Sequence, residues 1–157
     1  MLQKVDHSAL KVSQVTIVLL NILAFVFNFP LLALFVTFMM AIGTIFKFPG
    51  FGFIYRYGLR QLGWVRPRVL MDNPEPHRFA QGFGSVVMVG GVLAIYLGSP
   101  VLGWSLVWLV AGLAALNAFG GFCVGCAVYY WLNRLHVPGF HKAPPPGTVP
   151  GMRPRGA

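Results

Sequence analysis

Two long apolar blocks, separated by a polar and basic segment, dominate the pattern of this chain. The first block covers residues 12–46, the second begins at residue 79, and neither 12–46 nor 101–132 contains a charged residue. A straight helix over 12–46 would be roughly 50 Å long, whereas the hydrocarbon core of a membrane is about 30 Å thick. Each block is therefore expected to fold back on itself.

Turn signals divide the blocks at Asn28-Phe29-Pro30 and at Ser99-Pro100. Proline is well tolerated in the first turn of a helix and poorly in its interior. The pattern therefore predicts membrane-spanning helices over 12–27, 30–46, 79–97 and 101–119. The predicted fold class is all-α, a polytopic membrane protein with four transmembrane helices in two short hairpins.

The segment 101–132 could form one helix or break at Gly120-Gly121. We favour the break, because paired glycines weaken a helix and the matching helix in the first half must end by Pro49. A short apolar helical segment is then expected over 122–132.

The segment 47–78 carries six basic residues and only two acidic ones. The stretch 51–62 mixes aromatic residues with Arg56 and Arg60, which favours a helix lying at the membrane interface. The last segment, 136–157, is basic and rich in proline, a composition that predicts disorder when the segment is alone. The chain is thus divided into a transmembrane domain over 1–135 and a tail over 136–157.

The two halves of the chain also resemble one another. The run Asn28-Phe-Pro30 aligns with Gly98-Ser-Pro100, and Phe48-Pro-Gly-Phe51 aligns with Phe119-Gly-Gly-Phe122. This similarity suggests an internal two-fold repeat of helical hairpins.

The composition and charge of the chain indicate which solvent and which side of the membrane its segments face. The chain is 57% hydrophobic and only 10% charged, against about a quarter charged residues in soluble domains, so lipid is the expected solvent. The net charge of +9 does not indicate nucleic acid, because the basic residues flank apolar runs instead of alternating with aromatics along a stripe. Their distribution predicts that both termini and the middle loop are cytoplasmic.

The only two cysteines, Cys123 and Cys126, follow directly after the paired glycines. Residues at i and i+3 share one face of a helix, and a helix N-terminus favours the nucleophilic thiolate. A dithiol role is one interpretation. The other is packing, in which cysteine acts as a small apolar residue beside Gly121-x-x-x-Gly125.

No metal or cofactor is expected. His136 and His141 follow the cysteine pair, but their spacing differs from that of a zinc finger. Ala127 follows Cys126 where covalent haem attachment would require histidine.

Three polar residues are candidate substrate ligands: Arg78, Gln81 and Asn117. Arg78 could bind a lipid phosphate or an anionic sulfur substrate. Gln81 and Asn117 both fall toward the cytoplasmic ends of their helices and could share a pocket with the thiols. The predicted spans contain no carboxylate, which argues against a transporter driven by buried acidic residues.

Several motifs together resemble a known family. These are Val5-Asp6, Arg66-Pro67-Arg68, Arg78-Phe-Ala-Gln81 and Phe122-Cys-x-Gly-Cys-x-x-Tyr129. They resemble a bacterial membrane family of unknown function, domain of unknown function number 4395, over about residues 5–135. The resemblance implies a four-helix protein of the bacterial inner membrane. Members are sometimes encoded near thioredoxin-like or rhodanese-like proteins, which implies a thiol or sulfur role for Cys123 and Cys126.

The functional hypothesis is a membrane dithiol protein that exchanges disulfide or sulfane sulfur with a cytoplasmic thioredoxin-like or sulfurtransferase partner. In it, Cys123 attacks and Cys126 resolves. The alternative is an accessory or scaffold subunit of a larger membrane complex, with no chemistry of its own and with the tail as a docking arm. A small channel or carrier for a sulfur compound is a third option, and whether the chain is an enzyme is left open.

Overall fold

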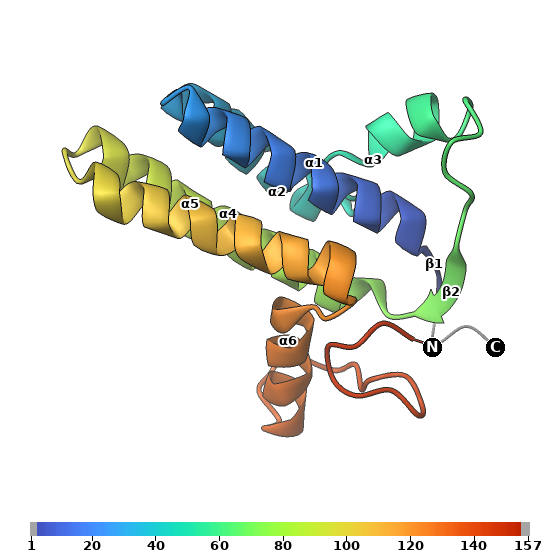
Figure 1. Ribbon diagram of the computed structural model, residues 1–157. Helices are drawn as coiled ribbons and strands as arrows, with labels where there is room; N and C mark the ends of the chain where they lie inside the picture. The colour runs from blue at the N-terminus through green and yellow to red at the C-terminus, as the bar shows by residue number, and fades with distance from the viewer. Residues whose placement is uncertain (1–2, 155–157) are drawn as a thin grey trace.

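Four apolar helices form two hairpins in the computed structural model, which describes residues 3–154 (Figure 1). Helices α1 (His7–Val26) and α2 (Pro30–Phe46) form the first hairpin, and α4 (Pro74–Tyr96) and α5 (Pro100–Ala115) form the second. Pro30 and Pro100 each begin a helix, where the missing N–H removes no intrahelical bond.

Three of these helices are long and apolar enough to cross a membrane: α1, α4, and α5 with its continuation to Gly120. Helix α2 is apolar but has only 17 residues. Over residues 3–154 the protein is therefore mainly helical with three candidate spans, and a fourth span through α2 stays a prediction.

Two helices begin five residues before the predicted starts, at His7 instead of 12 and at Pro74 instead of 79. Asp6 caps α1 by accepting a hydrogen bond from the Ser8 N–H at 2.9 Å. Pro74 opens α4, with Glu75 in its first turn. These polar first turns carry no apolar periodicity, so the hydrophobic pattern does not reveal them.

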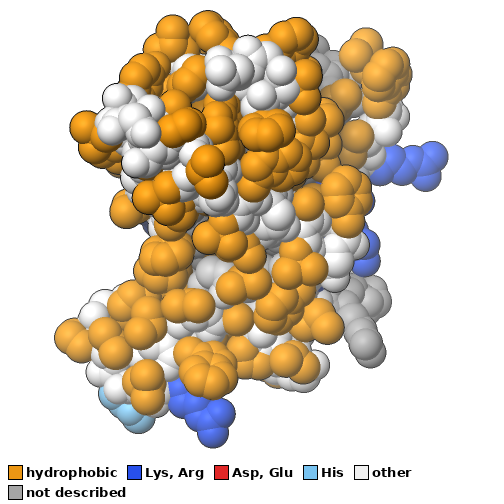
Figure 2. Space-filling view, turned by 60° about the vertical axis from the view of Figure 1, so that its left-hand side comes forward, with side chains coloured by type: hydrophobic (Ala, Val, Ile, Leu, Met, Phe, Trp, Pro, Cys, Tyr) orange, Lys and Arg blue, Asp and Glu red, His pale blue; other side chains and the backbone are white. Residues whose placement is uncertain are grey.

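The core lies between the two hairpins, where Val36, Met88 and Val107 are fully buried. Helices α4 and α5 approach closely at Gly91 and Gly103, since a Cβ on Gly103 would lie 2.5 Å from the Gly91 carbonyl oxygen. Many large apolar side chains remain on the outside, and Figure 2 shows them covering most of one face, with Lys and Arg at its margin. Such a surface indicates a membrane protein.

The two hairpin turns lie at one end of the bundle, and the remaining elements gather at the other (Figure 1). Strand β1 (Gln3–Asp6) pairs antiparallel with β2 (Val69–Asp72), so that Gln3 lies opposite Asp72. Between α2 and β2 lie the short helix α3 (Gly52–Ile54) and the π-helical turn η1 (Tyr55–Leu59). We call this end of the bundle, which also carries α6, the loop end.

Helix α5 continues as the π-helical turn η2 (Leu116–Gly120) and then breaks. Gly121 has a φ of +68°, a conformation that glycine adopts without steric cost. Helix α6 (Val124–Arg134) then leaves the bundle in a new direction (Figure 1). The segment 101–132 is thus broken and not one rod. Each half of the chain consists of a hairpin, a break and a short helix, while the two-fold repeat itself stays a prediction.

The C-terminal tail folds back onto this break. The Cys123 N–H donates to the Gly151 carbonyl at 2.7 Å, and the Arg153 N–H donates to the Gly121 carbonyl at 2.9 Å. Phe122 and Met152 form a bridge between the same two segments. We call residues 151–153 the strap. Disorder of the isolated tail remains a prediction.

Candidate functional site

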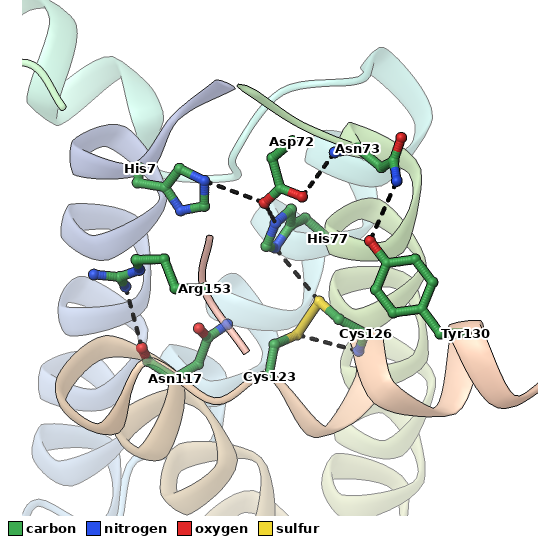
Figure 3. The surroundings of a disulfide bond; sticks show 9 residues. All are labelled: His7, Asp72, Asn73, His77, Asn117, Cys123, Cys126, Tyr130 and Arg153. Atoms are coloured by element: carbon green, nitrogen blue, oxygen red, sulfur yellow. Dashed lines mark hydrogen bonds and ion pairs between the residues drawn. A yellow bond between two sulfur atoms is a disulfide. The ribbon is translucent and has the colours of Figure 1, made fainter. Parts of the chain in front are cut away.

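Cys123 and Cys126 form a disulfide at the N-terminus of α6 (Figure 3). Cys123 is the N-cap residue, and its Sγ accepts a hydrogen bond from the Cys126 N–H at 3.2 Å. The break at Gly121 makes this arrangement possible, because it frees the first turn of α6 from α5. After reduction, the helix N-terminus and this N–H would stabilise a Cys123 thiolate.

A histidine faces the other sulfur. His77 Nδ1 lies 3.4 Å from Cys126 Sγ, and His77 Nε2 lies 3.0 Å from Asp72 Oδ2. Asp72 is the last residue of β2, and His77 lies in the first turn of α4. The junction from strand to helix therefore aligns a carboxylate, an imidazole and a sulfur (Figure 3).

The Asp72 carboxylate is almost enclosed. His7 Nε2 lies 3.2 Å from Oδ2, and the Asn73 N–H donates to Oδ1 at 2.8 Å. Burial raises the pKa of Asp72, but the contacts with His7, His77 and the Asn73 N–H outweigh it and hold the pKa well below its usual range. Asp72 is therefore ionised near neutral pH. A fixed negative charge therefore lies directly beside His77 Nε2.

Hydrogen bonds from the Asn73 side chain hold the same part of the site together. The Asn73 side-chain amide donates to the Ala143 carbonyl at 2.8 Å and to the Tyr130 hydroxyl at 3.4 Å. Burial raises the pKa of the Tyr130 phenol, so this group stays protonated. Helix α6, the tail and the start of α4 are thus joined beside the disulfide.

Two neighbouring cavities meet at Cys123. One, of about 130 Å³, has mainly apolar walls from α1, α4 and α5 and reaches Cys123. The other, of about 10 Å³, is lined by both cysteines together with polar residues that include Asp72, His7 and Arg153. We call them the apolar cavity and the polar pocket. Cys123 and His77 line both.

The structure brings together four of the five residues expected at a site. Gln81 and Asn117 line the apolar cavity with Cys123, and Gln81 Nε2 also donates to the Met40 carbonyl at 2.8 Å. Arg78 lines neither cavity. Its guanidinium donates to the Thr44 carbonyl at 3.4 Å, near the end of α2.

The histidine placed to bind a metal with the cysteines is His77, and not His136 or His141 of the tail. Among residues 3–154, His77 joins Cys123 and Cys126, with ligand atoms within 4.8 Å of one another, whereas His136 and His141 belong to no such group. A soft metal would need both thiols reduced, with His77 as the third ligand and Asp72 as its hydrogen-bond partner.

Sequence reasoning missed the residues that complete the site, namely Asp72, His77 and His7. The signal for His77 lies in Asn73-Pro74-Glu75-Pro76, which suggests a turn but also places a proline at the first position of a helix. His77 then falls in the first helical turn, on the helix that also carries Gln81.

The sequence model of one protein family, described as Domain of unknown function (DUF4395), matches residues 5–134. The chain belongs to this family. The DUF4395 match extends from β1 through α6 and so includes Asp72, His77 and both cysteines. No curated protein and no solved structure matches the chain. Membership of DUF4395 assigns no activity, so a functional conclusion must come from the site.

Proposed function

We propose that this DUF4395 protein is a membrane dithiol–disulfide exchange protein. One observation carries the proposal: the Cys123–Cys126 disulfide caps a helix and lies 3.4 Å from a histidine that is bound to an ionised carboxylate. A cysteine pair used only for packing requires neither a helix N-terminus nor a histidine–aspartate pair beside it. Both features favour thiolate chemistry.

A thiolate of the partner attacks Cys123 Sγ, and the bond between the two cysteine sulfurs breaks. The departing Cys126 thiolate takes a proton from His77 Nδ1, and Asp72 stabilises the imidazolium before transfer. A second thiolate of the partner then attacks its own sulfur in the mixed disulfide and expels the Cys123 thiolate. The partner leaves as a disulfide and this chain as a dithiol, and the reverse reaction uses the same groups.

The polar pocket is the entry for this partner. It is the cavity that both sulfurs line, together with the three residues of the strap. The basic residues of the central segment and the tail support a cytoplasmic loop end. The proposed partner is therefore a thioredoxin-like protein of the cytoplasm that presents its thiols in an extended segment, in place of the strap.

Trapping with glutathione disulfide tests the proposal on purified protein in lipid nanodiscs. Reduced Cys126→Ser is expected to accumulate a glutathione adduct on Cys123, detected as one added glutathione by mass spectrometry. Cys123→Ser is the matched control and is expected to react far more slowly, because it is Cys123 that caps α6 and accepts a backbone N–H of the first turn.

Equal inertness of both variants, in protein shown to be folded, would overturn the proposal and leave the accessory-subunit role. A persulfide on Cys123 after incubation with a sulfane-sulfur donor, without any glutathione adduct, would instead identify sulfur transfer as the function of the same site.

A further inference from the structure

We propose that the apolar cavity binds the ring of a lipid-soluble quinone, which accepts the electrons of the Cys123–Cys126 dithiol. This inference rests on the proposed exchange function and deepens it, because it names the second substrate. The disulfide would then connect a thiol partner in the polar pocket with an electron acceptor dissolved in the membrane.

The position of the apolar cavity favours a membrane-soluble ligand. Its walls come from three candidate spans and include Ile17, Val87 and Val110. Two further lining residues, Phe83 on α4 and Leu109 on α5, are exposed on the apolar outer surface. A ligand that enters beside them would come from lipid, not from water.

The size of the cavity selects a single ring. Its volume is about 130 Å³, and a dry protein cavity of about 150 Å³ is known to hold benzene. One six-membered quinone ring is therefore of suitable size, whereas its apolar tail would remain outside among the lipids.

Polar groups stand at the sulfur end of this mainly apolar space. Gln14 and Asn117 line it with His77. Gln14 Oε1 is buried and has no hydrogen-bond partner among residues 3–154. A hydroquinone hydroxyl could donate to this oxygen, and amide N–H groups could donate to the quinone carbonyls. An unpartnered buried acceptor costs free energy that such a ligand would recover.

The cavity reaches Cys123 but not Cys126, which fixes the order of steps. The Cys123 thiolate adds to a ring carbon of the quinone, and one ring oxygen gains a proton. The Cys126 thiol gives its proton to His77 Nδ1, and the resulting thiolate attacks Cys123 Sγ. The bond between sulfur and ring carbon breaks, its electron pair stays with the ring, and the second oxygen takes up the proton held by His77. The proton on the first oxygen is the one that the Cys123 thiol released. Dithiol and quinone thus become disulfide and hydroquinone.

Decylubiquinone is a suitable probe, because its fully substituted ring does not alkylate thiols irreversibly. Reduced protein in nanodiscs, freed of reductant, is mixed with this quinone, and quinone absorbance and free thiols are followed together. We expect one quinone reduced for every two thiols lost, at least about tenfold faster than with the same concentration of reduced glutathione.

Two neighbouring residues on α5 provide a matched pair of variants. Ala114 lines the cavity and Ala115 does not, and both are half-buried. Ala114→Leu is expected to slow quinone reduction at least about tenfold by filling the space, whereas Ala115→Leu leaves it unchanged. Val87→Phe fills the cavity from α4 and serves if Ala114→Leu does not fold.

The outcomes separate this inference from the proposed function. Normal glutathione exchange, with quinone reduction no faster than by glutathione alone, would overturn the quinone site and leave the exchange function standing. Equal effects of Ala114→Leu and Ala115→Leu would overturn the cavity as the binding site. Loss of exchange with glutathione as well as with quinone, in folded wild-type protein, would overturn both proposals.

Discussion

The break after α2 and the break after α5 begin with the same backbone conformation, but the residues around them differ in chemistry. Each starts with a residue of positive φ, Lys47 at +66° and Gly121 at +68°, and each leads into a short helix at the loop end. The N-cap of the first short helix is Phe51, a buried aromatic whose N–H donates to Ser13 Oγ at 3.2 Å. The N-cap of the second is Cys123.

The neighbours of the two breaks explain the difference. Phe51 belongs to the apolar core between the hairpins, so the first break serves packing. Cys123 and Cys126 pack in a separate cluster with Tyr129 and Tyr130, and the start of α4 brings His77 and Asp72 to the same place. A helix break alone is therefore not a site. It becomes one where a thiol caps the new helix beside a proton carrier.

The largest expected effect comes from exchanging the thiols. Cys123→Ser should lower the rate of disulfide exchange by at least about a thousandfold, because a serine hydroxyl forms neither a thiolate nor a disulfide. Gly52→Ser is the matched change after the first break, where the atom nearest to an added Cβ belongs to the Pro49 side chain, at 3.3 Å. Thiol-exchange assays that show equal losses for both would remove the functional distinction between the two breaks.

Replacement of the histidine should have the next largest effect. His77→Ala is expected to slow exchange about a hundredfold, because the Cys126 thiolate then leaves without a proton donor. His141→Ala, at an exposed position in the tail, is the control. A full rate in His77→Ala would show that Cys126 needs no histidine.

Asp72→Asn should have a smaller effect, about tenfold on the exchange rate, because His77 keeps its place but loses its counter-charge. The pKa of Asp72 is lower in the folded chain than in the unfolded chain. Its stabilisation is therefore complete above its unfolded pKa of about 3.9 and is lost as the pH falls below that value.

The measurement for this carboxylate is thermal unfolding across a pH series. The difference in melting temperature between wild type and Asp72→Asn should be full at pH 5 and should shrink below about pH 4. A difference that grows on acidification would contradict the assignment of Asp72 as the ionised partner.

The smallest effect concerns the strap. Gly151 has a φ of +85°, and a Cβ there would lie 2.8 Å from the Cys123 carbonyl oxygen. Gly151→Ala should therefore loosen the strap and raise the alkylation rate of the reduced cysteines about two- to fivefold. Gly147→Ala shares the positive φ but meets nothing within 4 Å. Equal alkylation rates in the two variants would show that the strap does not limit access.

Local signals in the sequence predict much of this architecture. Pro30 and Pro100 mark helix starts because their effect on the backbone is local, and the break at Gly121 depends on the residue's own conformational freedom. The pairing of β1 with β2 is not local. It joins Lys4 to Met71 across most of the first half of the chain, and strands of four residues leave no clear alternating pattern.

Some residues of the candidate site are likewise visible in the sequence, whereas others are brought together only by the fold. The cysteine pair is visible because its members are three residues apart, and the family motif draws attention to it. His77 and Cys126 are 49 residues apart in sequence, so only the packing of α6 against α4 reveals their contact. That packing depends on Gly125, where a Cβ would lie 2.8 Å from Ala80 Cα. Arg78 illustrates the converse: it neighbours His77 in sequence but bonds to the end of α2, away from both cavities.

The most direct test of the account is a redox titration of wild-type protein in nanodiscs, equilibrated with glutathione buffers and quenched with a mass-tagged alkylating reagent. We predict a single two-electron transition of Cys123 and Cys126, with a midpoint between about −120 and −270 mV, the range of known thiol-exchange proteins. A disulfide that persists at potentials below about −300 mV, or thiols that stay reduced across the whole series, would contradict the claim that this pair cycles.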